Sequence, residues 1–122
     1  MLIGTVIGLQ AVINITLYPL GRTKVEIECV MDTGFAGFLT LPPAVVTELQ
    51  LPYVAPIDAS LADNSRIVAN VHQVIILWNS VERLIPVLAM SHRPLIGTAL
   101  LEDYHLSIDF CEGGTILVDD IL

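Results

Sequence analysis

Alternation of apolar and polar residues is the dominant pattern along the chain. Val25, Ile27 and Cys29 fall on one side of an extended segment, and the charged residues between them fall on the other, as a strand with one solvated face requires. Similar runs predict further strands at residues 2–9, 11–18, 54–61, 66–78, 83–90, 105–110 and 115–118. Turn-forming residues separate most of these runs. The pattern therefore predicts a mostly antiparallel β protein.

Two helical segments interrupt the predicted strands. The first is expected over residues 40–50, where Thr40 can cap the helix, proline suits the first turn, and apolar residues recur at helical spacing. The second is short, from residue 98 to about residue 104. The chain contains no linker, low-complexity tract or repeat of solenoid period. We therefore expect one all-β domain over residues 1–122, a small closed β-barrel with one or two short helices.

The amino-acid composition limits which kinds of molecule the chain is expected to bind. Apolar residues make up 54% of the chain and charged residues 15%, which suggests that another subunit covers part of the apolar surface. The formal charge is −8 and the five Lys and Arg residues are spread singly, so we expect neither nucleic acid nor a membrane as a partner. The apolar run at residues 1–9 is too short to cross a bilayer and lacks the features of a signal peptide, so a cytoplasmic location is expected.

The cysteine and histidine residues show no ligand or disulfide pattern. Cys29 and Cys111 lack a framework spacing, so both are expected to be reduced thiols. His72, His92 and His105 are scattered, with no paired ligand spacing around them. We therefore expect no metal site and no cofactor.

The sequence Asp32-Thr33-Gly34 places one carboxylate at the abrupt end of an apolar strand. Peptide hydrolysis by carboxyl groups needs both a base and an acid. Two aspartates about 3 Å apart cannot both ionise, so they share one proton and divide these roles. Because the chain carries this motif once, the second carboxylate must come from another copy. A catalytic Asp32 therefore requires a homodimer.

Each residue after Asp32 has a role in this hypothesis. Thr33 offers a hydroxyl that can bond across the two-fold axis, and Gly34 lets its N–H approach the carboxylate. A bare Asp-Thr-Gly also occurs as an ordinary turn whose Asp caps backbone amides. The apolar strand that precedes Asp32 favours the catalytic interpretation. Asp109 lacks a Thr-Gly loop and is expected on a solvated strand face, and Trp78 is expected to pack in the core.

With Asp32-Thr33-Gly34-Phe35 and the downstream Leu95-Ile96-Gly97 followed by a short helix, the chain resembles the retropepsin-like aspartic proteases. The resemblance is to the single-domain prokaryotic branch whose motif is Asp-Thr-Gly-Phe, and it extends nearly end to end. It implies the acid protease fold, a homodimer, and an aspartic endopeptidase that activates water to hydrolyse a polypeptide substrate. It also implies that the Leu-Ile-Gly segment packs beneath the active-site loop.

The resemblance further implies a β-hairpin flap that closes over bound peptide. The segment at residues 59–66 has the expected position, and its Asp-Asn pair suits a tight turn. The candidate substrate-binding residues are Ala62, Asp63, Asn64 and Ser65.

The sequence allows an alternative interpretation both of the function and of the terminal segments. Phe35 supplies no hydroxyl where many relatives have one, and the flap tip has no glycine. The alternative function is therefore a catalytically weak or inactive dimerisation or peptide-binding module with the same fold. Residues 1–7 and 115–122 are apolar enough to interleave in a dimer's sheet, as in viral relatives, or to form edge strands of the monomer itself.

Overall fold

The structure is a computed structural model and describes residues 1–60 and 63–121. Within these residues it contains ten strands and two short helices. They are β1 (Leu2–Ile7), β2 (Gln10–Tyr18), β3 (Val25–Met31), β4 (Leu39–Leu41), α1 (Pro43–Glu48), β5 (Tyr53–Ser60), β6 (Arg66–Trp78), β7 (Val81–Ala89), β8 (Leu95–Ile96), α2 (Thr98–Leu101), β9 (Tyr104–Ile108) and β10 (Thr115–Asp120). None of the described helices has the length and hydropathy to cross a membrane. The prediction of a mostly β chain with two short helices is confirmed.

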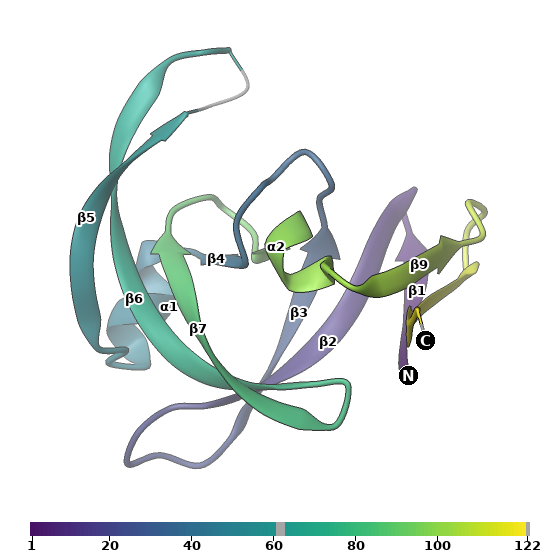
Figure 1. The fold of residues 1–122 in the computed structure, drawn as a ribbon, viewed down its shortest axis with the longest axis horizontal. Coiled ribbons are helices and arrows are strands. Elements are labelled where there is room, and N and C mark those ends of the chain that lie inside the picture. Colours follow the sequence, from purple (N-terminus) through teal and green to yellow (C-terminus); the bar gives the residue numbers. More distant parts are fainter. Residues whose placement is uncertain (61–62, 122) are drawn as a thin grey trace.

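The strands form one sheet that closes on itself. Its order is β5-β6-β7-β4-β8-β3-β2-β1-β10-β9, and a further antiparallel pairing joins β6 to β2. The pairings of β2, β3, β8, β4, β7 and β6 therefore make a closed ring (Figure 1). Most neighbours are antiparallel, but β3 pairs with β8 and β4 pairs with β7 in parallel. These two parallel pairs position the loop between β3 and β4.

Of the residues predicted to share one face of a strand, Cys29 is buried in the core, while Val25 and Ile27 are partly buried against it. In β2, Ile13, Ile15 and Leu17 are buried at every second position, because successive strand residues point to opposite faces. Trp78 is fully buried and its ring packs edge-on against Tyr104, with 5.9 Å between ring centroids. The expected packing role of Trp78 is confirmed.

The helix prediction at residue 40 was wrong in one respect. Thr40 is not a helix cap; it lies in β4 and is 1% exposed. Its hydroxyl donates to the carbonyl of Arg93 at 3.4 Å and accepts the N–H of Leu95 at 3.1 Å. The helix begins at Pro43, and no side chain caps it. The Thr40 hydroxyl bonds to the backbone of a distant segment, because a buried hydroxyl without a hydrogen bond would destabilise the fold.

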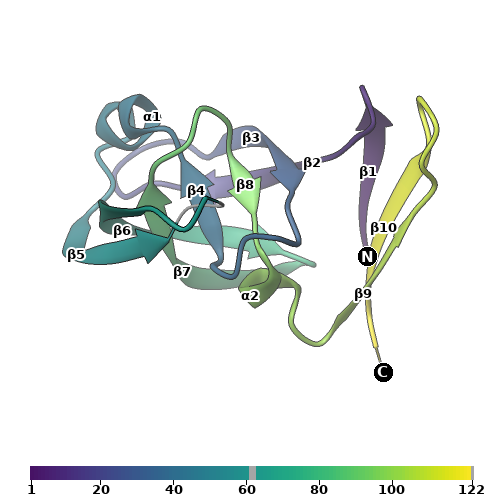
Figure 2. The same ribbon diagram turned by 90° about the horizontal axis from the view of Figure 1, so that it is seen from above.

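The terminal strands form a separate part of the sheet. β1 pairs with both β2 and β10, and β10 also pairs with β9. Figure 2 shows this three-stranded part standing beside the ring, with both chain ends in it. Within the chain, β1 lies between β2 and β10, and β10 lies between β1 and β9, so β9 is the edge strand at this end of the sheet. Ile3 and Ile7 are exposed on the side of β1 that faces away from the core.

The two cysteines differ in their surroundings, which gives a prediction for their reactivity. Burial raises the pKa of the Cys29 thiol to about 12, and the negative charge of Glu28 acts in the same direction. Cys111 is exposed. Because the thiolate is the reactive form, a thiol-specific reagent at about pH 8 is expected to label Cys111 alone in the native protein and both residues after unfolding. A Cys111→Ser variant should not react when native. Rapid native labelling of that variant would contradict the burial of Cys29.

Candidate active site

The loop at residues 32–38 is held by β8, which lies between the strand that enters the loop and the strand that leaves it (Figure 2). Met31, the last residue of β3, is paired in parallel with Ile96. Leu39, the first residue of β4, is paired with the same Ile96 from the opposite side. The N–H of Asp32 donates to the Ile96 carbonyl at 2.9 Å. Both ends of the loop are thereby fixed to one central strand.

The start of α2 supports the middle of the loop. The N–H groups of Gly97, Thr98 and Ala99 donate to the carbonyls of Phe38, Phe35 and Gly37 at 3.1, 2.9 and 3.1 Å. Three consecutive donors of one short segment therefore satisfy three acceptors of the loop. The Leu95-Ile96-Gly97 segment lies against this loop as the sequence predicted.

Phe35 holds the loop by packing. Its ring lies against the backbone of Gly37 and Gly97, so close that a Cβ built on Gly97 would stand 2.6 Å from the ring. The side chain is half-buried. The ring therefore fills the space between loop and helix, and the residue that follows the Asp-Thr-Gly motif contributes contact area instead of a hydrogen bond.

The carboxylate of Asp32 is half-buried and partly satisfied. One oxygen, Oδ1, accepts the N–H of Gly34 at 2.9 Å. Within residues 1–60 and 63–121, no second hydrogen bond to this carboxylate and no hydrogen bond of the Thr33 hydroxyl is found. Thr33 and Gly34 are exposed. Among the described residues, one oxygen of the Asp32 carboxylate and the Thr33 hydroxyl are thus left without a hydrogen bond.

Asp32 opens onto a cavity of about 370 Å³ between the loop and the terminal strands. Eight of its eleven lining residues have apolar side chains; the lining comprises Leu9, Gln10, Ala11, Val30, Met31, Asp32, Thr33, Leu95, Leu106, Ile108 and Phe110. Leu9 and Phe110 are 68% and 66% exposed. Sequence reasoning did not assign these two residues to the site. The available signal was the presence of a large apolar residue at the end of each predicted strand, beside a turn.

Comparison with solved structures decides the fold. The chain matches a retropepsin-like aspartic protease from Rickettsia conorii with a TM-score of 0.58, over 98% of this chain and 91% of that chain, at 15% identity. This chain has a retropepsin-like fold. No family model matches its sequence. The search of curated proteins finds no matching relative either.

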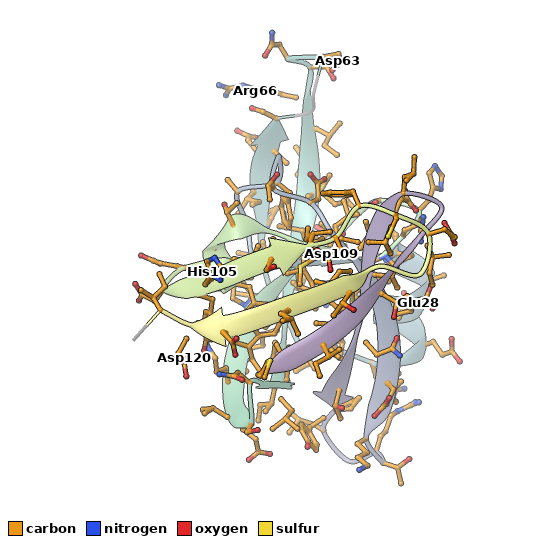
Figure 3. All side chains as sticks on the ribbon, turned by 90° about the vertical axis from the view of Figure 1, so that its right-hand side faces the viewer. Glu28, Asp63, Arg66, His105, Asp109 and Asp120 are labelled. Carbon is orange, nitrogen blue, oxygen red and sulfur yellow. The ribbon has the colours of Figure 1, made fainter. Side chains whose placement is uncertain are left out.

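The strands β5 and β6 flank the segment at residues 59–66 that the resemblance suggested as a flap. Figure 1 shows the β5–β6 hairpin extending beyond the ring of strands, and Figure 3 shows Asp63 and Arg66 at its tip. Ser65 donates its backbone N–H to Asp63 Oδ1 at 3.0 Å, and its hydroxyl bonds to the same oxygen. These bonds lower the pKa of the Asp63 carboxyl below its ordinary value. Asn64 takes a left-handed conformation with φ 67°, which asparagine tolerates in tight turns.

The structure does not bring the hairpin tip to the Asp32 loop. Asp63, Asn64 and Ser65 are not among the residues that line the Asp32 cavity. Ala62, the remaining predicted substrate-binding residue, lies outside the described residues.

Asp109, the other acidic residue considered from the sequence, lies outside the Asp32 cavity. Asp109 is exposed just after β9 and is not part of the cavity lining, although Ile108 and Phe110 on either side of it are (Figure 3). Within residues 1–60 and 63–121, no three His, Cys, Asp or Glu side chains gather closely enough to hold a metal ion.

Proposed function

We propose that the chain is an aspartic endopeptidase that acts as a homodimer, with one Asp32 from each subunit in a shared active site. The observation that carries this proposal is the Asp32 carboxylate, half-exposed on a loop held at both ends and in its middle. It opens onto a cavity with both apolar and polar walls in a chain of retropepsin-like fold. A carboxylate that only capped a turn would need neither the cavity nor this support.

The proposed mechanism is direct attack by water. One Asp32 takes a proton from the water, while the other donates its proton to the carbonyl oxygen of the peptide, which gives a gem-diol. As the C–N bond breaks, the first Asp32 passes the water proton to the leaving amine and the second recovers its proton from a gem-diol hydroxyl. Gly34 donates its N–H to one oxygen of each carboxylate and so holds that oxygen in place. The second oxygen is free to face the partner subunit and the water. No covalent intermediate forms.

The surface around the site supports a dimer. The Thr33 hydroxyl is exposed and can bond to its counterpart across a two-fold axis. Leu9 and Phe110 stand exposed beside the Asp32 cavity, and Ile57 and Val68 are exposed on the hairpin. Burying a side chain of this size is favourable by about 1.5–3 kcal/mol. A partner subunit and a bound peptide together would cover these residues.

The proposed substrate is an extended peptide that lies between the hairpin and the two Asp32 loops. The walls of the cavity include Val30, Leu106 and Ile108, so apolar side chains are expected to flank the cleaved bond. The hairpin tip at residues 63–65 would act as a flap that moves towards the peptide and excludes water.

Digestion of an unfolded protein tests this function. Casein is expected to be cleaved between acidic and neutral pH, pepstatin is expected to stop the cleavage, and the activity per chain should fall on dilution as sizing shows the dimer separating. Absence of cleavage at every pH would contradict the proposal and favour a peptide-binding module with the same fold. Cleavage that stays constant per chain in a monomer would contradict the shared site.

A further inference from the structure

Arg93 is an exposed residue on the loop between β7 and β8, and it is connected to the edge of the Asp32 cavity through two residues that line it. It precedes Leu95, which lines the cavity, by two residues. Its guanidinium donates a hydrogen bond to the side-chain oxygen of Gln10, and Gln10 also lines the cavity. Arg93 and Gln10 thus form a polar pair at the edge of a cavity whose other walls are mostly apolar.

The backbone of this loop is anchored to buried parts of the sheet. The carbonyl of Arg93 accepts hydrogen bonds from the hydroxyls of Thr40 at 3.4 Å and Ser91 at 3.1 Å. The next residue, Pro94, accepts the N–H of Val30 at 2.9 Å. A side chain on an anchored backbone loses less freedom on binding a ligand than one on a loose loop.

The free polar atoms of the pair are all hydrogen-bond donors. A guanidinium has five N–H donors and no acceptor, so the atom of Gln10 that it contacts must be the amide oxygen. The NH₂ group of Gln10 and the remaining N–H groups of Arg93 are then left to donate. Donors that surround a positive charge match a carboxylate, which Arg can bind through two parallel hydrogen bonds.

The charge of Arg93 has no carboxylate partner among the residues that the structure describes. Asp32 is the sole acidic residue that lines the cavity, and its role in the shared site is to hold a proton with its counterpart. In a chain of net charge −8, an unpaired cation at this position is available to a ligand.

We infer that Arg93 determines specificity, and that the peptide in the Asp32 cavity carries an acidic side chain that pairs with Arg93. Gln10 holds the guanidinium and supplies a further donor to the same carboxylate. This inference rests on the proposed binding of a peptide in this cavity. The inference specifies the class of substrate for that proposed binding: apolar peptides that contain Asp or Glu at one defined position.

Peptide binding to a catalytically disabled protein tests this directly. In an Asp32→Asn background, a single Glu is moved through every position of an otherwise uncharged, apolar-rich octapeptide, with Gln and Lys peptides as matched sets. Fluorescence anisotropy reports binding. At one position Glu is expected to bind about fivefold more tightly than Gln, as for a partly exposed charge pair, and the difference should shrink at high salt. Equal binding of Glu and Gln at every position would overturn the inference.

Charge variants assign the effect to one residue. Arg93→Gln is expected to abolish the preference for Glu, and Arg93→Glu to replace it with a preference for Lys. Arg83→Gln, which removes a cation on β7 that lines a different hollow with Glu102 and Asp103, should keep the preference. Persistence of the preference in Arg93→Gln would overturn the inference. So would loss of self-association in Arg93→Gln without any change in peptide discrimination, because Arg93 would then pair with the second subunit.

The test of peptide preference and the test of catalysis can fail independently of each other. A protein with intact Asp32 that binds Glu peptides preferentially but cleaves none would contradict the endopeptidase proposal and support the role of Arg93. Cleavage with no preference between Glu and Gln peptides would support the endopeptidase proposal and contradict the role of Arg93.

Discussion

Replacing Asp32 with asparagine is expected to lower the rate of casein cleavage by about 10³-fold, the typical contribution of a general acid or base. An amide neither takes a proton from water nor donates one to the substrate at neutral or mildly acidic pH. The variant should still fold, because the amide oxygen can accept the N–H of Gly34 as the carboxylate does. The side chain is also only half-buried. Initial rates with casein and thermal unfolding followed by circular dichroism measure the two effects separately.

A matched control is available in the same chain. Asp109 is exposed and does not line the cavity, so Asp109→Asn makes the same chemical change outside the proposed site. It is expected to leave the cleavage rate unchanged. If Asp32→Asn kept a rate within a few fold of the parent protein, Asp32 would not be the catalytic carboxylate.

Replacing Gly97 with alanine is expected to destabilise the protein by about 3 kcal/mol, the upper range for an overpacked site. The backbone at Gly97 is extended, with φ −101° and ψ 178°, so alanine meets no conformational penalty there. The cost is steric. The new Cβ would stand 2.2 Å from the carbonyl oxygen of Gly37 and 2.6 Å from that of Phe35. Backbone atoms cannot rotate away as a side chain can, so the loop that carries Asp32 must shift.

Urea unfolding and casein cleavage measure this prediction together. Because a displacement of catalytic groups by about 1 Å can cost about 10²-fold in rate, activity is expected to fall more than stability alone explains, even under conditions where the variant is folded. Gly21→Ala is the control. Gly21 has φ 69° and open space around its Cβ position, so it should lose about 1–2 kcal/mol through backbone strain alone and keep its activity when folded. Normal activity of a folded Gly97→Ala protein would contradict the proposed support of the loop.

The longer strands could be predicted from sequence and the short ones could not. Strands such as β2 and β6 span enough residues for alternation to be recognised. β4 and β8 have three and two residues, too few to show a period. They exist because β8 pairs with β3 and β4, and no local pattern encodes pairing between distant segments. Thr40 was misassigned for the same reason, since its hydroxyl bonds to residues more than fifty positions away.

The candidate site could likewise be predicted only where its residues are adjacent in the sequence. Asp32, Thr33 and Gly34 are adjacent in the sequence, so their motif could be recognised directly. The walls of the cavity come from segments near residues 9–11, 30–33, 95 and 106–110. They meet only because the terminal strands fold beside the ring. The pairing of Arg93 with Gln10, 83 positions apart, could not be anticipated from either residue.

Subunit mixing tests most directly whether one active site takes an Asp32 from each of two chains. The parent protein and Asp32→Asn are unfolded, combined in equal amounts and refolded together, with native mass spectrometry to verify mixed dimers. At constant total concentration, random pairing leaves about one quarter of the dimers with two intact chains. The account predicts that activity falls to about one quarter of that of the parent protein alone. A fall to only one half, with mixed dimers present, would mean that each chain cleaves by itself and would contradict the shared site.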